Sequence, residues 1–395
     1  MEQVYIVSAV RTAIGRYGGS LRLYTTGDLG SIAIKEAVTK AGIFPTQVEE
    51  VIMGEARQST ESANVARVAS LKAGIPEEVP AFTINRLCSS AMEAMHSAFL
   101  RIITGEAEIL VAGGVEIMSR SPHYLRNARW GDLPVQLVDS NVEGASRAQP
   151  VDIYGPDLGM GITAENVAEK YNLSREEQDK FALRSQQLAA KAIAEGKFKD
   201  EIVPVEVVFK KKVSVFDTDE HVRPDTTLEV LSKLRPAFKS NGTVTAGNSC
   251  GRNDGSAAMV LASGSAVKKL GLTPMARLLG FSAVGVDPRY MGIGPVPAVN
   301  KLLKKLDLKL EDIDLIELNE AFASQSLACI NELGLDIDRT NVNGGAIALG
   351  HPLGATGCRI SVTLLYEMKR RNARLGLATL CTGGGQGMAL VMENV

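Results

Sequence analysis

The sequence is poor in the features that build disulfide-rich, metal-binding or membrane proteins. Its five cysteines are an odd number without a C-x-x-C or C-x-x-H pairing, which argues against a disulfide framework and a zinc site. No apolar run approaches the roughly 18 residues of a membrane-spanning helix. The N-terminus also lacks a long apolar signal core and an Arg-rich presequence, so we expect an unexported protein in the reducing cytoplasm.

A strong excess of one charge is also missing. Lys and Arg number 43 against 45 Asp and Glu, so no overall basic field favours a nucleic acid partner. The local run Lys210, Lys211 and Lys212 is interpreted as a solvated face. What remains is an ordinary globular composition, 45% hydrophobic and 22% charged, in 395 residues that suffice for two or three domains.

Short apolar runs alternate with helical patterns along the chain. Strands are predicted at residues 4–7, 51–53, 109–112, 313–318 and 377–381. Helices are predicted at residues 28–41, where Gly42 ends the pattern, and at residues 175–196. This alternation predicts an α/β fold with a largely buried sheet.

Two segments far apart in the chain resemble each other. GIFPTQVEEVIMG, residues 42–54, aligns with LDLKLEDIDLIELN, residues 306–319. The alignment places Val48, Val51 and Gly54 on Ile313, Ile316 and Asn319, and it predicts a duplication into two similar halves. Between them, residues 119–249 are more polar and are predicted to form an inserted region that covers a ligand.

The stretch NRLCSSAMEAM places Cys88 at the start of a predicted helix. Ser90 and Glu93 fit the S-x-x-E capping box, so the helix is expected to begin just after Ser90. Free N–H groups and the helix dipole at that position favour a thiolate, which makes Cys88 a candidate nucleophile. A small buried hydrophobic residue is the alternative.

His351 lies in the glycine-rich stretch NGGAIALGHPLGATG. Such a stretch brings backbone close to another group, and an imidazole held there can act as a base for Cys88. The alternative is a glycine-rich turn with an incidental histidine. His96, His123 and His221 are predicted to be structural or surface residues.

Two further candidates follow apolar strands, where α/β proteins build their sites. Cys381 ends one strand and precedes three glycines in LCTGGGQG, and Asn319 follows another in ELNEAFA. The glycines do not predict a dinucleotide loop, because the chain ends at Val395, too soon for the rest of such a unit.

Gly247 to Gly251 matches the competing motif G-x-S-x-G, with Ser249 as the nucleophile of a serine esterase. A strand-like run at residues 243–246 precedes it and His351 follows in the expected chain order. The motif is short, the sequence after it begins a helix poorly, and it leaves Cys88 and Cys381 unexplained. It therefore receives little weight.

Taken together, these motifs resemble those of the thiolases from one end of the chain to the other. The matching stretches, in family order, are IVSAVRT, NRLCSS, VAGGVEIMS, MGITAENVAEKY, RPDTTLEVLSKLRPAF, VTAGNSCGRNDG, MGIGPVPA, LNEAFA, NGGAIALGHPLGATG and CTGGGQG. The resemblance implies two duplicated halves in a five-layer αβαβα core with an inserted loop domain that binds coenzyme A. The expected domains are residues 1–118 with 250–270, residues 119–249, and residues 271–395, in a homodimer or homotetramer.

The resemblance also implies roles for single residues. Cys88 corresponds to the acyl-accepting nucleophile, His351 to its base and Cys381 to the acid and base at the carbon. Two oxyanions are expected. His351 with Asn319, through a water, should bind the oxygen of the thioester enolate, and the backbone N–H groups of Cys88 and Gly383 should bind the oxygen of the tetrahedral adduct. Coenzyme A is expected as a substrate, with no tightly bound cofactor and no metal. Its expected contacts, from nucleotide to thioester, are Arg223, Ala246, Cys250, Met160, Met291, Ala321 and Phe322.

The implied reaction is reversible cleavage of a 3-ketoacyl-CoA by coenzyme A, or condensation of two acetyl-CoA, within fatty acid metabolism such as β-oxidation. A 3-ketoacyl synthase-like condensing enzyme is the nearest alternative, but Cys381 favours a thiolase. A non-catalytic acyl-CoA carrier would not need the catalytic groups that the sequence retains. Departures from the family pattern leave the acyl chain length open, and they fall at Ala91, Gly159, Cys250 and Arg252.

Overall fold

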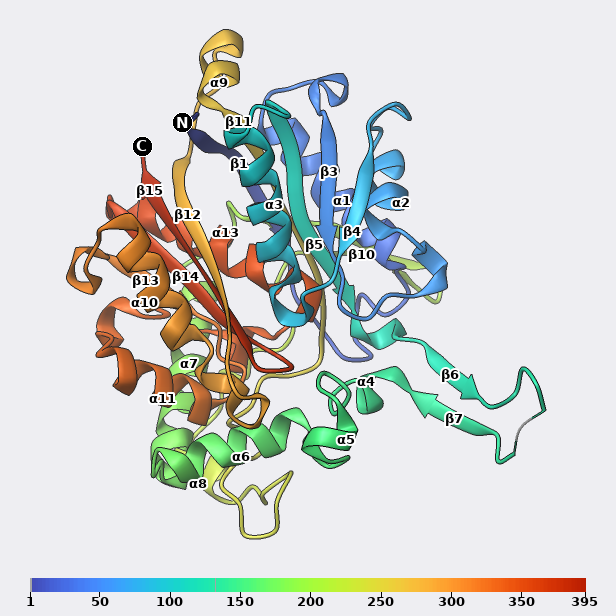
Figure 1. The fold of residues 1–395 in the computed structure, drawn as a ribbon, viewed down its shortest axis with the longest axis vertical. Helices are drawn as coiled ribbons and strands as arrows, with labels where there is room; N and C mark the ends of the chain where they lie inside the picture. Colours follow the sequence, from blue (N-terminus) through green and yellow to red (C-terminus); the bar gives the residue numbers. More distant parts are fainter. Residues whose placement is uncertain (1, 132) are drawn as a thin grey trace.

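The two halves of the chain repeat one arrangement of strands and helices in the computed structural model, which describes residues 2–131 and 133–395 (Figure 1). The first half consists of β1 (Val4–Thr12), α1 (Thr26–Lys40), β3 (Glu50–Gly54), α2 (Val65–Lys72), β4 (Ala81–Ile84), α3 (Ser90–Ile103), β5 (Ile109–Ile117) and β11 (Asn253–Ser263). The second half consists of β12 (Ala276–Gly285), α10 (Pro295–Leu306), β13 (Leu315–Leu318), α11 (Ala323–Leu333), α13 (Thr356–Arg371), β14 (Leu375–Thr382) and β15 (Gln386–Asn394).

The strand order is the same in both halves. In the first it is β4-β3-β5-β11-β1, and in the second β13-β14-β15-β12, with Thr340 pairing parallel to Ile316 in the place of β4. Each pair of neighbouring strands in the first half has the same direction, parallel or antiparallel, as its counterpart in the second half. The two sheets join edge to edge where Val4 of β1 pairs with Leu278 of β12.

The predicted duplication is confirmed at the level of single turns. A 3-10 turn, η1 (Pro45–Gln47), precedes β3, and η6 (Leu310–Asp312) precedes β13. Val48 and Ile313, which the sequence alignment superimposes, each follow their turn directly and are buried.

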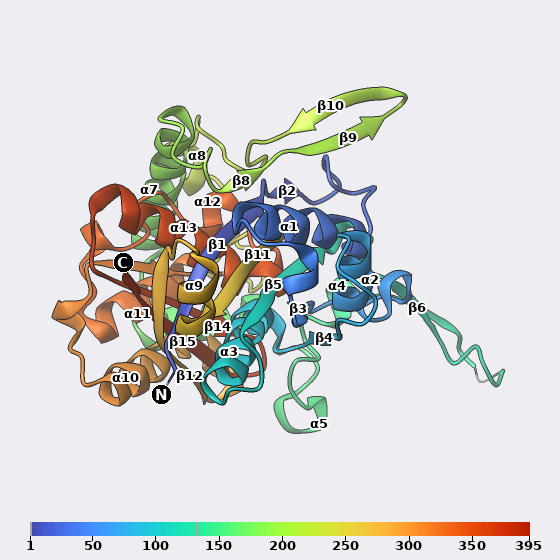
Figure 2. The same ribbon diagram turned by 90° about the horizontal axis from the view of Figure 1, so that it is seen from above.

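Helices and sheets alternate in five layers. Helices α1 and α2 cover the outer face of the first sheet, and α10 and α11 cover the outer face of the second (Figure 2). Helices α3 and α13 lie between the sheets and pack against both. The predicted five-layer αβαβα core is therefore confirmed.

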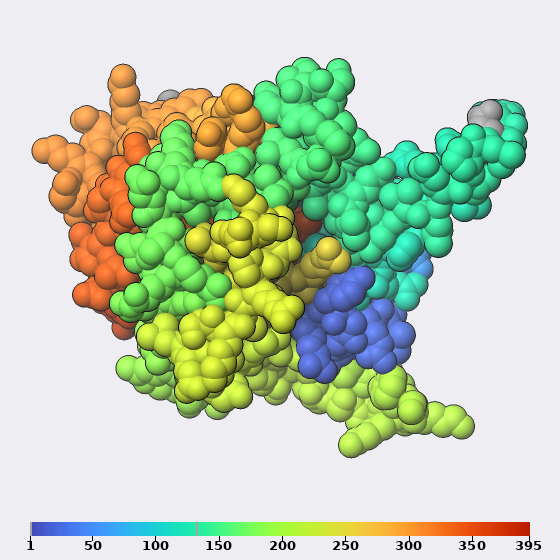
Figure 3. All heavy atoms as spheres, turned by 90° about the horizontal axis from the view of Figure 1, so that it is seen from below, coloured from blue at the N-terminus to red at the C-terminus, as the bar shows by residue number. Residues whose placement is uncertain are grey.

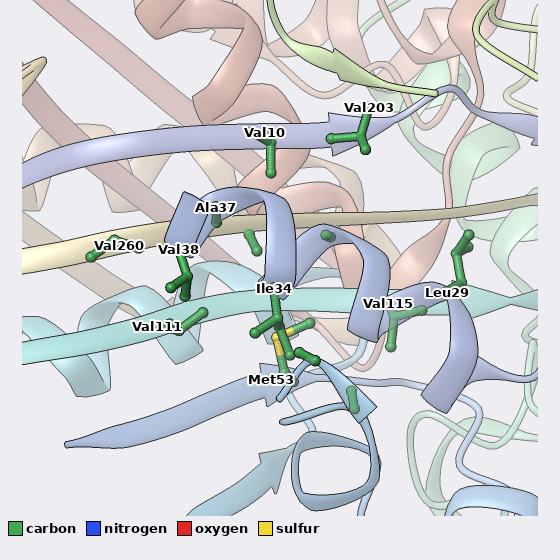
Figure 4. Close-up of a cluster of buried hydrophobic side chains, with 14 of the residues drawn as sticks. Val10, Leu29, Ile34, Ala37, Val38, Met53, Val111, Val115, Val203 and Val260 are labelled. Carbon is green, nitrogen blue, oxygen red and sulfur yellow. The ribbon is translucent and has the colours of Figure 1, made fainter. Parts of the chain in front are cut away.

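The apolar stripe of α1 shows how the sequence builds one of these layers. Leu29, Ile34 and Val38 recur at helical spacing and are buried against β-branched residues of the sheet such as Val111 and Val115 (Figure 4). Thr25 and Asp28 form a capping box at the start of the helix. These signals explain why the predicted helix 28–41 matches α1 within about two residues.

Strand β5 is longer than the predicted run 109–112, and all nine of its residues are buried. The prediction stopped at Gly113, but the strand continues through both glycines to Ile117. A Cβ on Gly113 would lie 2.1 Å from the Ala257 carbonyl oxygen, and one on Gly114 would lie 2.1 Å from that of Gly354. These glycines permit close packing inside the strand and do not end it.

The predicted capping box at Ser90 and Glu93 is wrong, although α3 does begin at Ser90. The Ser90 hydroxyl accepts from the Arg86 N–H and donates to the Leu87 carbonyl, and thereby closes the turn before the helix. Glu93 instead pairs with Arg86 at 2.9 Å. The S-x-x-E pattern is therefore used for other contacts.

The segment between β5 and β11 carries its own small elements. They are β6 (His123–Arg126), β7 (Gln136–Asp139), α4 (Ser140–Glu143), α5 (Val151–Tyr154), α6 (Met160–Lys170), α7 (Arg175–Ala194), β8 (Ile202–Val203), β9 (Val205–Phe209), β10 (Lys212–Phe216) and α8 (Leu228–Ser232). Helix α7 matches its prediction, and the lysine run lies exposed at the turn of the β9–β10 hairpin (Figure 2). The predicted strand at residues 243–246 is wrong, because only an isolated bridge between Thr245 and Pro236 forms there.

A buried ion cluster joins this segment to the first strand. The fully buried Arg11 of β1 donates from Nε to Glu201 at 2.6 Å. Its two Nη groups donate to both carboxylate oxygens of Asp219 at 2.7 and 2.9 Å.

Across residues 2–131 and 133–395, no helix is long and apolar enough to cross a membrane.

We predict that Arg11→Met lowers the free energy of unfolding by about 3–5 kcal/mol, because it leaves two buried carboxylates without their cation. Urea unfolding followed by circular dichroism measures this change. The control Arg289→Met removes an exposed pair with Asp287 and should leave the unfolding midpoint nearly unchanged. Equal effects of the two substitutions would contradict the structural role of the Arg11 cluster.

Candidate active site

The duplicated halves bring the two leading candidates to the same end of the core. Cys88 lies in the 3-10 turn η3 (Leu87–Ser89) before α3, and His351 lies between α12 (Ala346–Leu349) and the turn η8 (Leu353–Ala355) before α13. The two turns contact each other. Figure 3 shows a hollow in this face of the molecule, with dark red atoms of the C-terminal part of the chain visible at its bottom.

Burial raises the pKa of the Cys88 thiol, although three groups oppose the rise. The backbone N–H groups of Gly383 and of Cys88 itself and the Arg57 guanidinium act near the sulfur, and each lowers the pKa. Desolvation outweighs these groups, so the helix start favours the thiolate less than burial opposes it. Cys88 needs a partner to accept its proton.

His351 is held in one tautomer. The Thr356 hydroxyl donates its only proton to the Pro352 carbonyl at 2.9 Å, so it accepts from Nδ1–H of His351 at 2.7 Å. Nε2 therefore carries the lone pair and can accept a proton. Burial, and secondarily the Arg359 charge, lowers the pKa of His351 to about 3, so the resting site holds a neutral imidazole.

Asn319 follows β13 and presents an amide without a partner. The residue is only 1% exposed, and neither its Nδ2 nor its Oδ1 has a hydrogen bond among the described residues. Its backbone is fixed, because the N–H donates to the Thr379 carbonyl at 3.0 Å. A buried amide left unpaired is costly, so it is suited to hold a water or a substrate oxygen.

Cys381, near the end of β14, lies in a buried apolar cluster. That cluster also contains four of the residues expected to contact coenzyme A or its acyl group, namely Met160, Met291, Ala321 and Phe322. Burial and the neighbouring thiols, Cys88 first among them, raise the pKa of Cys381 well above its usual range. Cys381 therefore rests as a thiol that can give a proton to a strong carbon base.

The inserted segment packs against the backbone at Gly383. A Cβ there would lie 3.2 Å from Leu87 Cδ1, 3.4 Å from Ala148 Cβ and 3.5 Å from Met160 Sδ. Its neighbour Gly384 has a φ of +78° and would meet the Ala148 carbonyl oxygen at 2.4 Å. The glycines after Cys381 thus serve a tight turn and a close approach of backbone.

The residues expected along coenzyme A are spread from the site to the surface. The Cys250 N–H donates to the Ala321 carbonyl at 3.0 Å, and burial, then the Cys88 charge, raises the pKa of Cys250 to about 12. Arg223 and Ala246 are exposed, and the Arg223 N–H donates to Gln186 at 2.8 Å. Their contacts with a ligand stay predictions.

The geometry contradicts Ser249 as an esterase nucleophile. The residue is 8% exposed, and its hydroxyl donates to the Thr245 carbonyl at 2.7 Å. The motif is followed by strand β11, whereas a nucleophile elbow requires a helix there.

The remaining histidines lie apart from this chemistry. His96 is 3.6 Å from Glu93 and stacks on Phe281, and His123 is exposed in β6. His221 packs at Gly251, where a Cβ would lie 2.5 Å from its ring. Residues 2–131 and 133–395 contain no group of three or more His, Cys, Asp or Glu arranged to hold a metal.

Sequence reasoning missed the residues that hold the site together. Glu116 accepts backbone N–H groups from Ala56, Arg57 and Gly354 at 2.8–3.0 Å and so fixes the loop after His351. Asn253 accepts from the His351 N–H at 3.0 Å. A usable signal existed for Glu116, since an acid within an apolar strand run needs a buried partner.

We predict that Thr356→Val slows alkylation of Cys88 by iodoacetamide about tenfold at neutral pH, as expected for the loss of one buried hydrogen bond. Without an acceptor for Nδ1–H, the tautomer with its proton on Nε2 is favoured, and that tautomer cannot take the thiol proton. Peptide mass spectrometry measures the rate at Cys88. Thr356→Ser keeps the hydroxyl and should react normally, and an unchanged rate in Thr356→Val would remove His351 as the proton acceptor.

Comparison with known proteins assigns both halves of the chain. The family described as "Thiolase, N-terminal domain" matches residues 4–265, and "Thiolase, C-terminal domain" matches residues 272–394. An acetyl-CoA acetyltransferase of Thiocystis violacea is 49% identical over 402 residues and covers 100% of each chain. A β-ketoadipyl-CoA thiolase of Pseudomonas aeruginosa is 51% identical over 399 residues, which cover 100% of this chain and 99% of the relative.

A solved structure supports the same family assignment. The crystal structure of the Bacillus anthracis acetyl-CoA acetyltransferase superimposes with a TM-score of 0.97 at 49% identity, covering 100% of this chain and 99% of that one. With both domains matched and relatives of about half-identical sequence aligned from end to end, the chain belongs to the thiolase family.

Proposed function

We propose that Cys88 carries the acyl group and that His351, Cys381, Asn319 and Gly383 serve the steps around it. The protein is an acyltransferase with the thiolase reaction. A 3-ketoacyl-CoA is cleaved by coenzyme A to acetyl-CoA and a shortened acyl-CoA, and the reverse reaction condenses two acetyl-CoA. The buried amide of Asn319, which lacks a partner, is the observation that best supports this assignment of residues.

In the first step His351 Nε2 accepts the Cys88 proton while the sulfur attacks the C3 carbonyl of the substrate. The oxygen becomes an oxyanion, which the N–H groups of Cys88 and Gly383 bind, since both act on the sulfur where this oxygen forms. The C2–C3 bond then breaks, leaving the shortened acyl group on Cys88 and the enolate of acetyl-CoA.

The enolate requires its own donors and a proton. Asn319 and His351, bridged by a water, bind the thioester oxygen, and one such preorganised donor is typically worth about 3 kcal/mol. Cys381 gives its thiol proton to C2 and completes acetyl-CoA. Its raised pKa keeps that proton in place until a strong carbon base appears beside it.

The second half of the reaction returns the enzyme to its starting state. A new coenzyme A binds, and its thiol attacks the acyl group on Cys88 as the Cys381 thiolate, which gave its proton to C2, removes the thiol proton. The same pair of N–H groups binds the second oxyanion, and the Cys88 thiolate leaves and is protonated. Arg223, Ala246 and Cys250 are proposed to hold coenzyme A under the segment 119–249.

The packing of Cys381 favours a thiolase over a decarboxylating synthase. A condensing enzyme that forms its carbanion by losing carbon dioxide needs no thiol at this position, whereas Cys381 lies among Met160, Met291, Ala321 and Phe322. The relatives are named for different acyl groups, acetyl and β-ketoadipyl. These names therefore leave the acyl group open. We keep as predictions the favoured direction, a cytoplasmic location and a part in β-oxidation.

We also propose that the chain acts as a homodimer or homotetramer. The β6–β7 hairpin extends from the body of the molecule (Figure 1) and exposes large apolar residues. Trp130 and Leu133 are each 84% exposed, and Leu137 is 73% exposed. Such a patch favours a protein contact, and light scattering across a dilution series would measure it.

We predict that incubation with acetyl-CoA acetylates Cys88. The reason is that its turn contacts the turn that follows His351, and that the Cys88 and Gly383 N–H groups act on its sulfur. Peptide mass spectrometry locates the added acetyl group. The control Cys250→Ser keeps a small polar side chain beside Cys88 and should still be acetylated, whereas acetyl found only on Cys250 or Ser249 would overturn the assignment.

We predict that Cys381→Ser separates the two half-reactions. A serine hydroxyl is a far weaker acid and base than a thiol, so proton transfer at C2 should fail by orders of magnitude. Acetyl transfer to Cys88 needs no carbon proton transfer and should persist. Exchange of acetyl-CoA methyl protons with deuterated water measures the difference, and exchange at the wild-type rate would remove Cys381 from this role.

A further inference from the structure

Arg57 lies in the wall of the site and has no role in the chemistry described above. It follows β3 in the loop that Glu116 fixes, since its N–H donates to Glu116 Oε1 at 3.0 Å. The preceding residue, Ala56, accepts from Asn85 Nδ2 at 3.2 Å, three residues before Cys88. The backbone at Arg57 is therefore tied directly to the turn that carries the nucleophile.

The guanidinium of Arg57 forms no ion pair with a carboxylate of the described residues. Its buried Nε has no hydrogen-bond partner among them, and Glu116 acts on it only through its charge. The group lies flat against the inserted segment, because a Cβ on Gly144 would be 2.5 Å from Cζ and 2.6 Å from both Nη atoms. An arginine enclosed in this way without an anion is costly, so its position needs an explanation.

Neighbouring acids do not supply one. Glu116 already accepts three backbone N–H groups and forms no ion pair with the Arg57 side chain. The second acid, Glu55, is fully buried, and burial, then the Glu116 charge, raises its pKa to about 8, which keeps it largely neutral at pH 7. The hydrogen-bond donors of Arg57 are therefore available to a ligand, although Glu116 offsets part of its charge.

The acyl group of a substrate is the ligand within reach. Gly144, which contacts the guanidinium, is four residues before Ala148, which packs over Gly383 and Gly384. The Arg57 charge also acts on the Cys88 sulfur, where the acyl group is attached. Coenzyme A is expected to enter past Ala246 and Cys250, in a different part of the chain, which leaves the Arg57 side to the acyl tail.

We propose that Arg57 binds a carboxylate at the far end of the acyl group, so that the enzyme prefers 3-ketoacyl-CoA substrates with a dicarboxylic acyl chain. The proposal rests on the thiolase mechanism above and adds the substrate class. A planar guanidinium matches a carboxylate through two parallel hydrogen bonds, which gives orientation as well as affinity.

Thiolysis of matched substrates tests the proposal. The probes are β-ketoadipyl-CoA and its seven- and eight-carbon homologues, each beside the neutral 3-ketoacyl-CoA of equal chain length. In the wild type, the ratio of kcat/KM for diacid over neutral substrate should exceed one at one or more lengths. Arg57→Gln should lower that ratio about 10- to 100-fold, as expected for losing hydrogen bonds to a charged group.

Other outcomes overturn the proposal. If neutral and diacid substrates slow equally in Arg57→Gln, the guanidinium serves Cys88 and not the acyl tail. If the wild type disfavours the diacid at all three lengths, the preference does not exist. Arg147→Gln is the matched control. This arginine lies three residues after Gly144 in the inserted segment, is 49% exposed and should not change the ratio. Wild-type turnover of the neutral substrates tests the thiolase reaction separately, and thermal melting checks folding of each variant.

Discussion

The close approach of α3 and α13 at their first turns is the constraint on which the site depends. A Cβ on Gly357 of α13 would lie 2.6 Å from Met92 Cβ of α3, and one on Gly54 of β3 would lie 2.4 Å from the Ser90 backbone. A side chain at Gly357 would separate the two helices, one at Gly54 would push α3 away from β3, and either would move the turns before the helices. Cys88 and His351 stand in those turns, one from each half, so backbone contact sets the distance between nucleophile and base.

The site rests in its neutral form because burial outweighs local polar groups. Desolvation raises the pKa of both cysteines and lowers that of His351, so the unliganded site holds two thiols and an imidazole. Negative charge develops only when a substrate is present, on its oxygen atom, and the hydrogen-bond donors that bind this oxyanion are already in place. This arrangement protects reactive sulfur between turnovers and still supports an oxyanion during them.

Much of the fold could be predicted, because local signals and packing agree in this chain. The duplication follows from the alignment of Val48 with Ile313, and α1 follows from its apolar stripe and the Thr25 cap. Cys88, His351 and Cys381 were found because each stands beside glycines or a helix start. The predictions failed where a polar side chain makes a contact that the spacing of residue types does not specify.

Ser90 and Arg57 illustrate that limit. The Ser90 hydroxyl closes a turn and so cannot cap the helix, a choice that local spacing does not reveal. Arg57 reads as an ordinary polar loop residue until its neighbours from residues 116 and 144 are known. The same holds for the stretch 243–246, whose strand-like pattern is overridden because Asn248 binds the Thr245 N–H and bends the chain.

The buried ion cluster of Arg11 has a consequence for how the protein is made. Its partners Glu201 and Asp219 are 190 and 208 residues downstream, and the long strands that pair with β1 in the sheet, β11 and β12, are later still. The first strand to leave the ribosome is therefore among the last to gain its place. Until more than half of the chain has been synthesised, the edges of β1 lack their long partner strands, and the first 118 residues alone do not form a complete folding unit.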